Sequence, residues 1–162
     1  MKRRWLLVLL PLLLLLGIAY LGVSWYMASQ VVEAERNPPE AAPDSVGLEY
    51  QQVSFPPRGW GFQLKGWYIL SQEDKGTIVM VHGLDSNKGS SGVGALEIAR
   101  DLHQQGFTIL MFDLRAHGES EGDSFSGGFF EQDDVLGALD YLVEERGTPL
   151  GRIGLMGFSM GA

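Results

Sequence analysis

An uninterrupted apolar run near the N-terminus is the strongest feature in the pattern of hydrophobic and polar positions. Residues 5–27 carry no charged side chain and are dominated by leucine, and Lys2, Arg3 and Arg4 precede them. At about 1.5 Å per residue, this run is long enough to cross a hydrocarbon core of roughly 30 Å. The pattern predicts a basic tip over residues 1–4 and a transmembrane helix over residues 5–27.

A cleaved signal peptide is the alternative interpretation of the same run. Signal peptides have apolar regions of only about 7–15 residues and small residues at the cleavage site. Ala28 and Ser29 could serve a signal peptidase, whereas Met27 fits poorly upstream of them, so the pattern favours an uncleaved, single-pass anchor. Because basic residues stay on the cytoplasmic side, we expect the N-terminus in the cytoplasm and the domain on the extracytoplasmic side. Aromatic residues are expected at the two interfaces: Trp5, Trp25 and Tyr26.

Residues 28–45 have the composition of a linker. Prolines interrupt the segment at positions 38, 39 and 43, four acidic side chains solvate it, and few of its residues could join a core. The pattern changes at residue 46 and predicts a folded domain over residues 46–162.

The predicted domain begins with two alternating segments. Residues 49–55 and 62–70 alternate well enough to form two antiparallel strands, joined by a turn at residues 56–59.

Short apolar runs then alternate with amphipathic segments. The runs are typical of strands buried on both faces and cover residues 77–81, 107–112 and 152–158. Amphipathic helices are predicted between them over residues 93–105 and 131–146. Alternating strands and helices of these lengths imply a parallel sheet with right-handed crossovers. We therefore expect an α/β fold in which two antiparallel leading strands precede a parallel βαβαβ unit.

Composition and charge narrow the class of protein. The chain has 162 residues and a formal net charge of −8. Without the three basic residues at its start, 12 − 3 = 9 basic residues stand against 20 acidic ones, a net charge of −11. This dispersed acidity argues against a nucleic-acid partner, which would need a basic patch on the protein. The absence of cysteine excludes disulfides, thiol nucleophiles and cysteine-based zinc sites.

A G-x-S-x-G motif follows the last predicted strand. Its sequence is GFSMG, from Gly157 through Ser159 to Gly161. In a nucleophile elbow, the serine occupies a strained strand-to-helix turn that lifts its hydroxyl clear of the sheet. Side chains two residues before and after it would collide as the chain doubles back, so both positions need glycine. An ordinary glycine turn is the alternative, but the position directly after a buried strand favours Ser159 as a catalytic nucleophile.

A second candidate feature is the tripeptide His82, Gly83 and Leu84, which follows the strand predicted at residues 77–81. Acyl transfer puts negative charge on the substrate oxygen, and backbone N–H groups must stabilise that charge. We expect the backbone N–H groups of Leu84 and Met160 to be these oxyanion donors. His82 is expected to fix its loop by hydrogen bonds rather than to act as a general base.

The loop after the next predicted strand, residues 113–120, has the sequence DLRAHGES. With this loop, the histidine-glycine turn and the serine elbow in this order and at these spacings, the chain resembles an α/β-hydrolase. The resemblance is to the serine aminopeptidase, monoacylglycerol-lipase and lysophospholipase-like branch, and it covers essentially the whole predicted domain. It implies that Asp113, Arg115 and His117 shape and brace the site rather than perform the chemistry. Ala116 departs from the family pattern, which has glycine there.

The resemblance implies a serine hydrolase that cleaves an ester or amide in a small-molecule, lipid or peptide substrate, with no cofactor or metal. In this family the triad acid and then the histidine follow the serine. His82, His103 and His117 all precede Ser159, and His103 is expected on a helix surface. We therefore expect residues 46–162 to be the N-terminal, incomplete part of an α/β-hydrolase domain, truncated after the nucleophile elbow. The chain as written should lack the triad acid and base and be inactive alone. The alternative is a non-catalytic membrane-tethered module or an inert product of a truncated gene.

Overall fold

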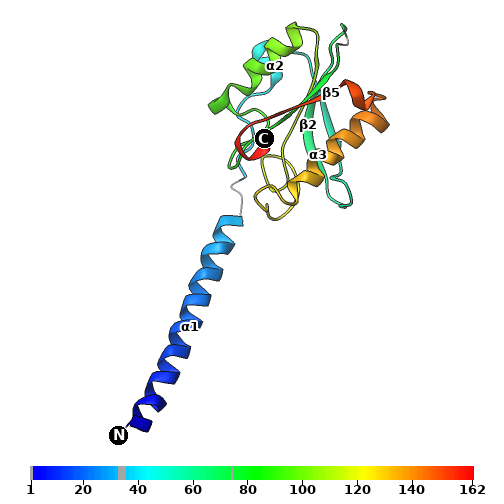
Figure 1. The fold of residues 1–162 in the computed structure, drawn as a ribbon. Helices are drawn as coiled ribbons and strands as arrows, with labels where there is room; N and C mark the ends of the chain where they lie inside the picture. Colours follow the sequence, from blue (N-terminus) through cyan, green and yellow to red (C-terminus); the bar gives the residue numbers. More distant parts are fainter. Residues whose placement is uncertain (1, 33–35, 74) are drawn as a thin grey trace. The chain divides into compact units, whose positions relative to one another are not determined.

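The computed structural model describes residues 2–32, 36–73 and 75–162. The chain forms two compact units, Met1–Glu33 and Ala34–Ala162 (Figure 1). The first unit is a long helix, α1 (Lys2–Val32), and the second contains a five-stranded sheet with helices.

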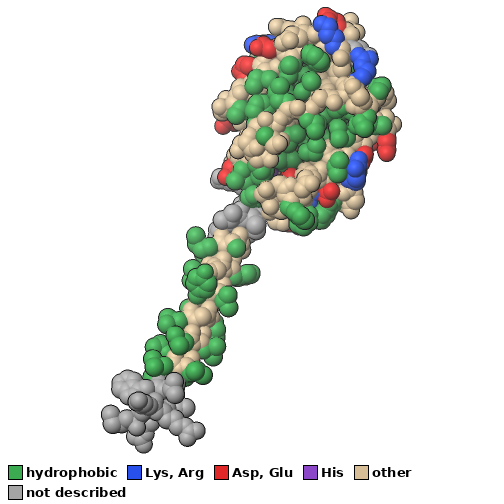
Figure 2. Space-filling view, in the orientation of Figure 1, with side chains coloured by type: hydrophobic (Ala, Val, Ile, Leu, Met, Phe, Trp, Pro, Cys, Tyr) green, Lys and Arg blue, Asp and Glu red, His purple; other side chains and the backbone are tan. Residues whose placement is uncertain are grey.

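α1 is apolar around its circumference. Val8–Ser29 is a stretch of 22 residues with a mean hydropathy of 2.2 and exposed side chains, and Figure 2 shows hydrophobic side chains on every visible side of it. By length and composition it could cross a membrane or serve as a signal sequence. The helix extends beyond the predicted residues 5–27 at both ends. The side chain of Trp5 lies outside those described, whereas those of Trp25 and Tyr26 are exposed.

The second unit is built on a mixed sheet. Its strands are β1 (Gln51–Phe55), β2 (Leu64–Ile69), β3 (Thr77–Val81), β4 (Thr108–Phe112) and β5 (Ile153–Gly157). They lie in the order β1-β2-β4-β3-β5. β1 pairs antiparallel with β2 and β2 with β4, whereas β3 pairs parallel with both β4 and β5. Two antiparallel leading strands followed by three parallel ones confirm the fold class predicted from the sequence.

Helices cover both faces of the sheet (Figure 1). α2 (Ala95–Gln104) lies on one face, and α3 (Glu131–Asp140), which continues into a π-helical turn at Tyr141–Glu145, lies on the other. Successive side chains of β4 point to opposite faces of the sheet, so this strand contributes to the cores on both faces. Leu110 and Phe112 join the cluster beneath α3, and Ile109 and Met111 join the one beneath α2.

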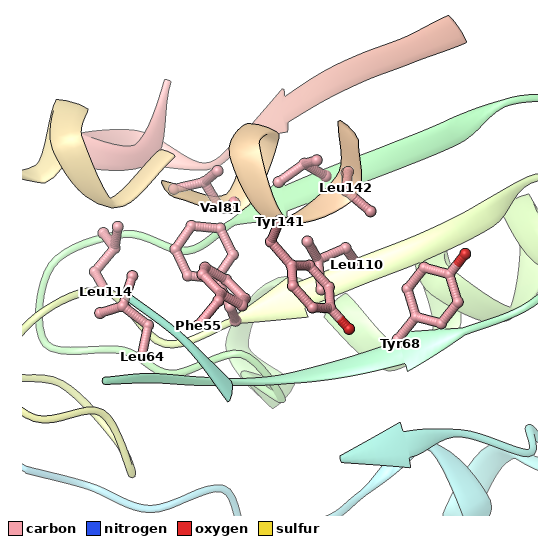
Figure 3. Close-up of a cluster of buried hydrophobic side chains, with 11 residues drawn as sticks. Phe55, Leu64, Tyr68, Val81, Leu110, Leu114, Tyr141 and Leu142 are labelled. Atoms are coloured by element: carbon pink, nitrogen blue, oxygen red, sulfur yellow. The ribbon is translucent and has the colours of Figure 1, made fainter. Parts of the chain in front are cut away.

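The core beneath α3 is rich in aromatic rings, shown in Figure 3. The ring of Phe55 stacks on that of Tyr141 at 5.0 Å and meets that of Phe112 edge-on at 5.5 Å. Leu64, Leu110 and Leu142 are fully buried among these rings and their neighbours.

Part of the segment expected to be a linker packs on the domain. Pro43–Val46 forms a 3₁₀ turn with Pro43 buried, and Leu48 is buried just after it. Proline is favoured at the start of a helical turn because its φ is already fixed near the helical value. Two alanines and Val46 pack against the core beneath α2. Residues near position 43 therefore belong to the domain, because their small apolar side chains cover that core.

β5 lies at the edge of the sheet formed by the described residues. Its sequence is as apolar as that of a central strand, yet the side chain of Leu155 is 59% exposed. Figure 2 shows hydrophobic side chains gathered over the part of the domain where β5 lies in Figure 1.

Candidate active site

The carboxyl ends of the parallel strands bring the three sequence motifs to one edge of the sheet. β3, β4 and β5 run in the same direction, so the segments after them begin side by side. These segments start at His82, Asp113 and Phe158. In open α/β sheets this edge is where ligands bind.

Ser159 lies on a strained turn directly after β5. The Phe158 N–H donates to the Val81 carbonyl oxygen at 3.0 Å, and the Gly161 N–H donates to the Phe158 carbonyl oxygen at 3.0 Å. Between these two bonds Ser159 has a φ of +55°, in the left-handed region that costs a non-glycine residue about 1–2 kcal/mol. Its side chain is exposed. The backbone therefore presents the hydroxyl at the edge of the sheet.

The two glycines of the motif are required by close backbone approaches. A Cβ atom on Gly157 would overlap the carbonyl oxygen of Gly161. One on Gly161 would lie 2.5 Å from the carbonyl oxygen of Val81 and 2.6 Å from that of His82. Both distances are far below van der Waals contact, so neither position accepts a larger residue without displacing the backbone.

Gly83 brings the loop after β3 against the serine. A Cβ atom on Gly83 would lie 3.0 Å from the carbonyl oxygen of Phe158 and 3.7 Å from the Ser159 hydroxyl oxygen. Leu84 follows at once, and neither its backbone N–H nor that of Met160 donates a hydrogen bond within the described part of the chain. Two candidate oxyanion donors therefore flank the serine with their N–H groups free.

His82 is held inside the loop by both ring nitrogens. Its Nε2 accepts a hydrogen bond from the Leu114 N–H at 3.0 Å, so Nδ1 carries the proton and donates to the Gly83 carbonyl oxygen at 2.7 Å. Burial lowers the pKa of His82 to about 4, because an imidazolium would lose its hydration there. The ring is therefore neutral at pH 7 and joins the loops after β3 and β4.

Asp113 and Lys88 form a buried ion pair between the same two loops. The Lys88 Nζ lies 2.6 Å from Asp113 Oδ2 and 2.6 Å from Glu119 Oε2, and the Lys88 and Asp113 side chains are 1% and 0% exposed. Asp113 also accepts the backbone N–H groups of Lys88 and Glu119. This cluster fixes the loop that carries Leu84.

Arg115 and His117 are also buried in the loop after β4. The Arg115 guanidinium donates to Asp134 in α3 at 2.7 and 3.0 Å. Burial raises the pKa of Asp134, and the hydrogen bonds from Arg115 oppose that rise. His117 Nδ1 lies 2.8 Å from the Arg115 carbonyl oxygen, while its buried Nε2 has no hydrogen-bond partner among the described residues. Ala116 has a φ of +60°, which accounts for the glycine that the family pattern has at this position.

No described histidine is placed to activate Ser159. None of the three hydrogen-bonds to its hydroxyl in the described part of the chain, and His103 contacts the Leu70 carbonyl oxygen from α2 instead. Within residues 2–32, 36–73 and 75–162, no group of three or more histidine, aspartate or glutamate side chains could hold a metal ion.

Sequence reasoning missed two parts of this site. Lys88 is the one basic residue in a loop rich in glycine and serine, but its partner Asp113 lies 25 residues away and only the sheet brings them together. The second part is a groove of about 400 Å³ beside the elbow, lined by α3, β5 and the elbow itself. Its residues include Val135, Leu155 and Met160.

A strained G-x-S-x-G turn at the carboxyl edge of a parallel sheet defines the architecture of α/β-hydrolases. The family described as alpha/beta hydrolase fold matches residues 76–162. The chain belongs to this family.

Two curated relatives are themselves uncharacterised. YqkD of Bacillus subtilis is 34% identical over 106 residues, which are 65% of this chain and 33% of that protein. YfhR of Salmonella typhimurium is 28% identical over 118 residues, 70% of this chain and 38% of that protein. The chain thus spans 33% of the length of one of these relatives and 38% of the other.

Similar solved structures include two hydrolases. The esterase Pf2001 of Pyrococcus furiosus is 30% identical, with a TM-score of 0.73 over 80% of this chain and 49% of that one. XC6422 of Xanthomonas campestris, a serine hydrolase without a lid, is 27% identical, with a TM-score of 0.57 over 77% of this chain and 55% of that one. The chain therefore has an α/β-hydrolase fold with esterase-like neighbours.

Proposed function

We propose that the protein is a membrane-anchored serine hydrolase that cleaves an ester or amide through Ser159. The observation that carries the proposal is the left-handed backbone of Ser159, a non-glycine residue held at a φ of +55° between two glycines that admit no side chain. A strained conformation persists only where the surrounding structure fixes it, and such positions cluster at functional sites.

In the proposed reaction, the Ser159 hydroxyl oxygen attacks the substrate carbonyl carbon while a base removes its proton. The backbone N–H groups of Leu84 and Met160 donate to the oxyanion of the tetrahedral intermediate. The leaving alcohol or amine takes the proton, an acyl-serine ester remains, and water then releases the acid. In α/β-hydrolases the acid and base follow the serine in sequence, so we assign neither role to a residue described here.

The buried polar residues have positioning roles in this proposal. His82, Asp113 and Lys88 join the loops after β3 and β4, and Gly83 allows the first loop to approach Ser159. Arg115 ties the second loop to α3. The order and sequence of these loops favour the serine aminopeptidase, monoacylglycerol-lipase and lysophospholipase-like branch. A small-molecule, lipid or peptide substrate, rather than nucleic acid, fits the acidic chain.

We propose that α1 anchors the protein as a single transmembrane span. Its predominantly apolar stretch of 22 residues is longer than the apolar region that a signal peptide needs. The basic residues before it support an orientation with the N-terminus in the cytoplasm and the domain on the other side.

A fluorophosphonate probe tests the hydrolase directly, because it phosphonylates only an activated serine. The full-length protein that contains this chain should be labelled in its native membranes, and Ser159→Ala should abolish labelling. Ser91→Ala is the matched control, because Ser91 is an exposed serine in a short turn outside the site, and it should leave labelling unchanged. Labelling that persists in Ser159→Ala would place the nucleophile elsewhere.

A further inference from the structure

Three aromatic side chains lie exposed on the domain, with the half-buried Phe62 beside them, and we refer to the group as the aromatic patch: Trp60, Phe62, Phe129 and Phe130. Phe129 is 71% exposed, Phe130 43% and Trp60 41%. The ring of Phe130 lies 5.0 Å from that of Phe129 and 5.6 Å from that of Trp60. Clustered exposed rings of this size are typical of a surface that binds a partner.

The aromatic patch is held in place from beneath. The guanidinium of Arg115 lies 4.6 Å from the centre of the Trp60 ring, and the Trp60 indole N–H donates to Asp133 at 2.9 Å. Trp60 thus presents one apolar ring face while its polar N–H is already satisfied. The patch is therefore preorganised to enter an apolar environment without losing a hydrogen bond.

The patch borders the candidate active site. Gly128 and Gln132, which flank Phe129 and Phe130, line the groove beside the elbow together with Met160. An apolar partner on the patch would therefore lie next to the opening of that groove.

Arg36, the first described residue of the second unit, is bonded to the loop next to the same patch. The Arg36 side chain donates to the carbonyl oxygen of Ser120 at 2.8 Å and also to that of Gly122. A Cβ atom on Gly122 would lie 3.5 Å from the ring of Phe62. The contacts of Arg36 thus connect it to the aromatic patch through Gly122 and Phe62.

The connection to the proposed span is short. Seven peptide units separate Ser29, the last residue of the apolar stretch, from Arg36. Fully extended, they reach about 25 Å. The second unit has 162 − 33 = 129 residues, for which the expected radius of gyration is about 14 Å. Chain length alone therefore keeps Arg36 within about 25 Å of Ser29, a reach comparable to the size of the domain.

We propose that the aromatic patch inserts into the interface of the membrane that holds α1. The inference rests on the proposed anchoring and not on the chemistry of Ser159. Tryptophan and phenylalanine rings favour the boundary between headgroups and acyl chains. Beyond its basic tip the chain has a net charge of −11, so the surface it fits is a zwitterionic lipid layer bound by apolar contact, with little dependence on salt.

Single cysteine reporters test this placement, because the chain has no native cysteine. Phe129→Cys carries an environment-sensitive nitrobenzoxadiazole label in the whole protein reconstituted into phosphatidylcholine vesicles. Leu150→Cys is the matched control, because Leu150 is also apolar and 63% exposed, and it lies just before β5, at the amino ends of the parallel strands. We expect lipid-borne doxyl groups to quench the label at position 129 several-fold more strongly than the label at position 150, in low and high salt alike.

A second measurement leaves the patch aromatic. In a Trp5→Phe, Trp25→Phe background, only Trp60 and the buried Trp67 fluoresce. Brominated lipids should quench this emission, and Trp60→Phe should remove the quenched component.

Equal quenching at positions 129 and 150, or bromolipid quenching unchanged by Trp60→Phe, would overturn the proposal. Release of the protein by alkaline carbonate would refute anchoring and docking together, whereas loss of probe labelling at Ser159 with quenching intact would refute only the hydrolase.

Discussion

Lys88 and Asp113 are both removed from solvent and meet at 2.6 Å between the loops that follow β3 and β4. The pair connects the segment carrying Leu84 to the segment carrying Arg115. Removing one partner of a buried ion pair typically costs about 3–5 kcal/mol, because the other charge stays buried without compensation.

Lys88→Met should therefore destabilise the domain by about 3–5 kcal/mol. Urea unfolding of the detergent-solubilised protein, followed by tryptophan emission, measures this change. Lys75→Met is the control, because Lys75 pairs with Glu73 on the surface with both side chains more than half exposed, and it should cost less than about 1 kcal/mol. Equal effects of the two substitutions would show that the buried pair does not hold the loops.

Gly157→Ala should distort the turn at Ser159, because its new methyl group would overlap the Gly161 carbonyl oxygen. We expect destabilisation of about 1–3 kcal/mol, as for other overpacked sites, and loss of fluorophosphonate labelling. Gly151→Ala provides the comparison, since a Cβ atom there meets nothing within 4 Å, and it should be labelled normally. Normal labelling of Gly157→Ala would mean that the turn is not needed for reactivity.

Stability should fall as the pH drops from about 6.5 towards 4. Burial lowers the pKa of His82 to about 4, so between these values the unfolded chain binds a proton that the folded chain does not, and unfolding is favoured. The loss amounts to about 3 kcal/mol and levels off below pH 4. Urea unfolding of His82→Gln across this range should lack this part of the pH dependence, while His103→Gln should keep it. An unchanged pH dependence in His82→Gln would contradict the assignment.

α1 should remain in the membrane when membranes are washed with alkaline carbonate. A Leu13→Arg, Leu16→Arg double variant should be retained less well, because each arginine near the centre of a span costs about 2.5–3.5 kcal/mol on insertion. Immunoblots of pellet and supernatant report the distribution. A soluble processed form that begins near Ser29 would instead identify the segment as a signal peptide.

The fold could be predicted from the sequence because its signals are local. The apolar runs at residues 77–81 and 107–112 can be buried only as central strands, and they became β3 and β4. The turn at Ser159 was likewise visible in the spacing of two glycines. Residues 28–45 were different, because prolines and acidic side chains suggested a free linker while Pro43 and its neighbours cover the core beneath α2.

The remaining parts of the site depend on contacts across the sheet. Lys88 gave no local sign that it would be buried, since Asp113 and Glu119 are distant in sequence. Asp134 lies in the first turn of a predicted helix, and only the structure shows that it holds Arg115. The exposure of Phe129 and Trp60 could not be predicted either, because aromatic residues in loops are as often buried as exposed.

Trapping the acyl-enzyme is the most direct test that Ser159 is the nucleophile. The full-length protein that contains this chain would be mixed with p-nitrophenyl acetate, quenched in acid during turnover, digested and mapped by mass spectrometry. We expect an acetyl group on Ser159 alone. In Ser159→Ala, both the acetyl group and the release of p-nitrophenol should be lost. Ester hydrolysis with the acetyl group on another residue, or turnover that persists without Ser159, would contradict it.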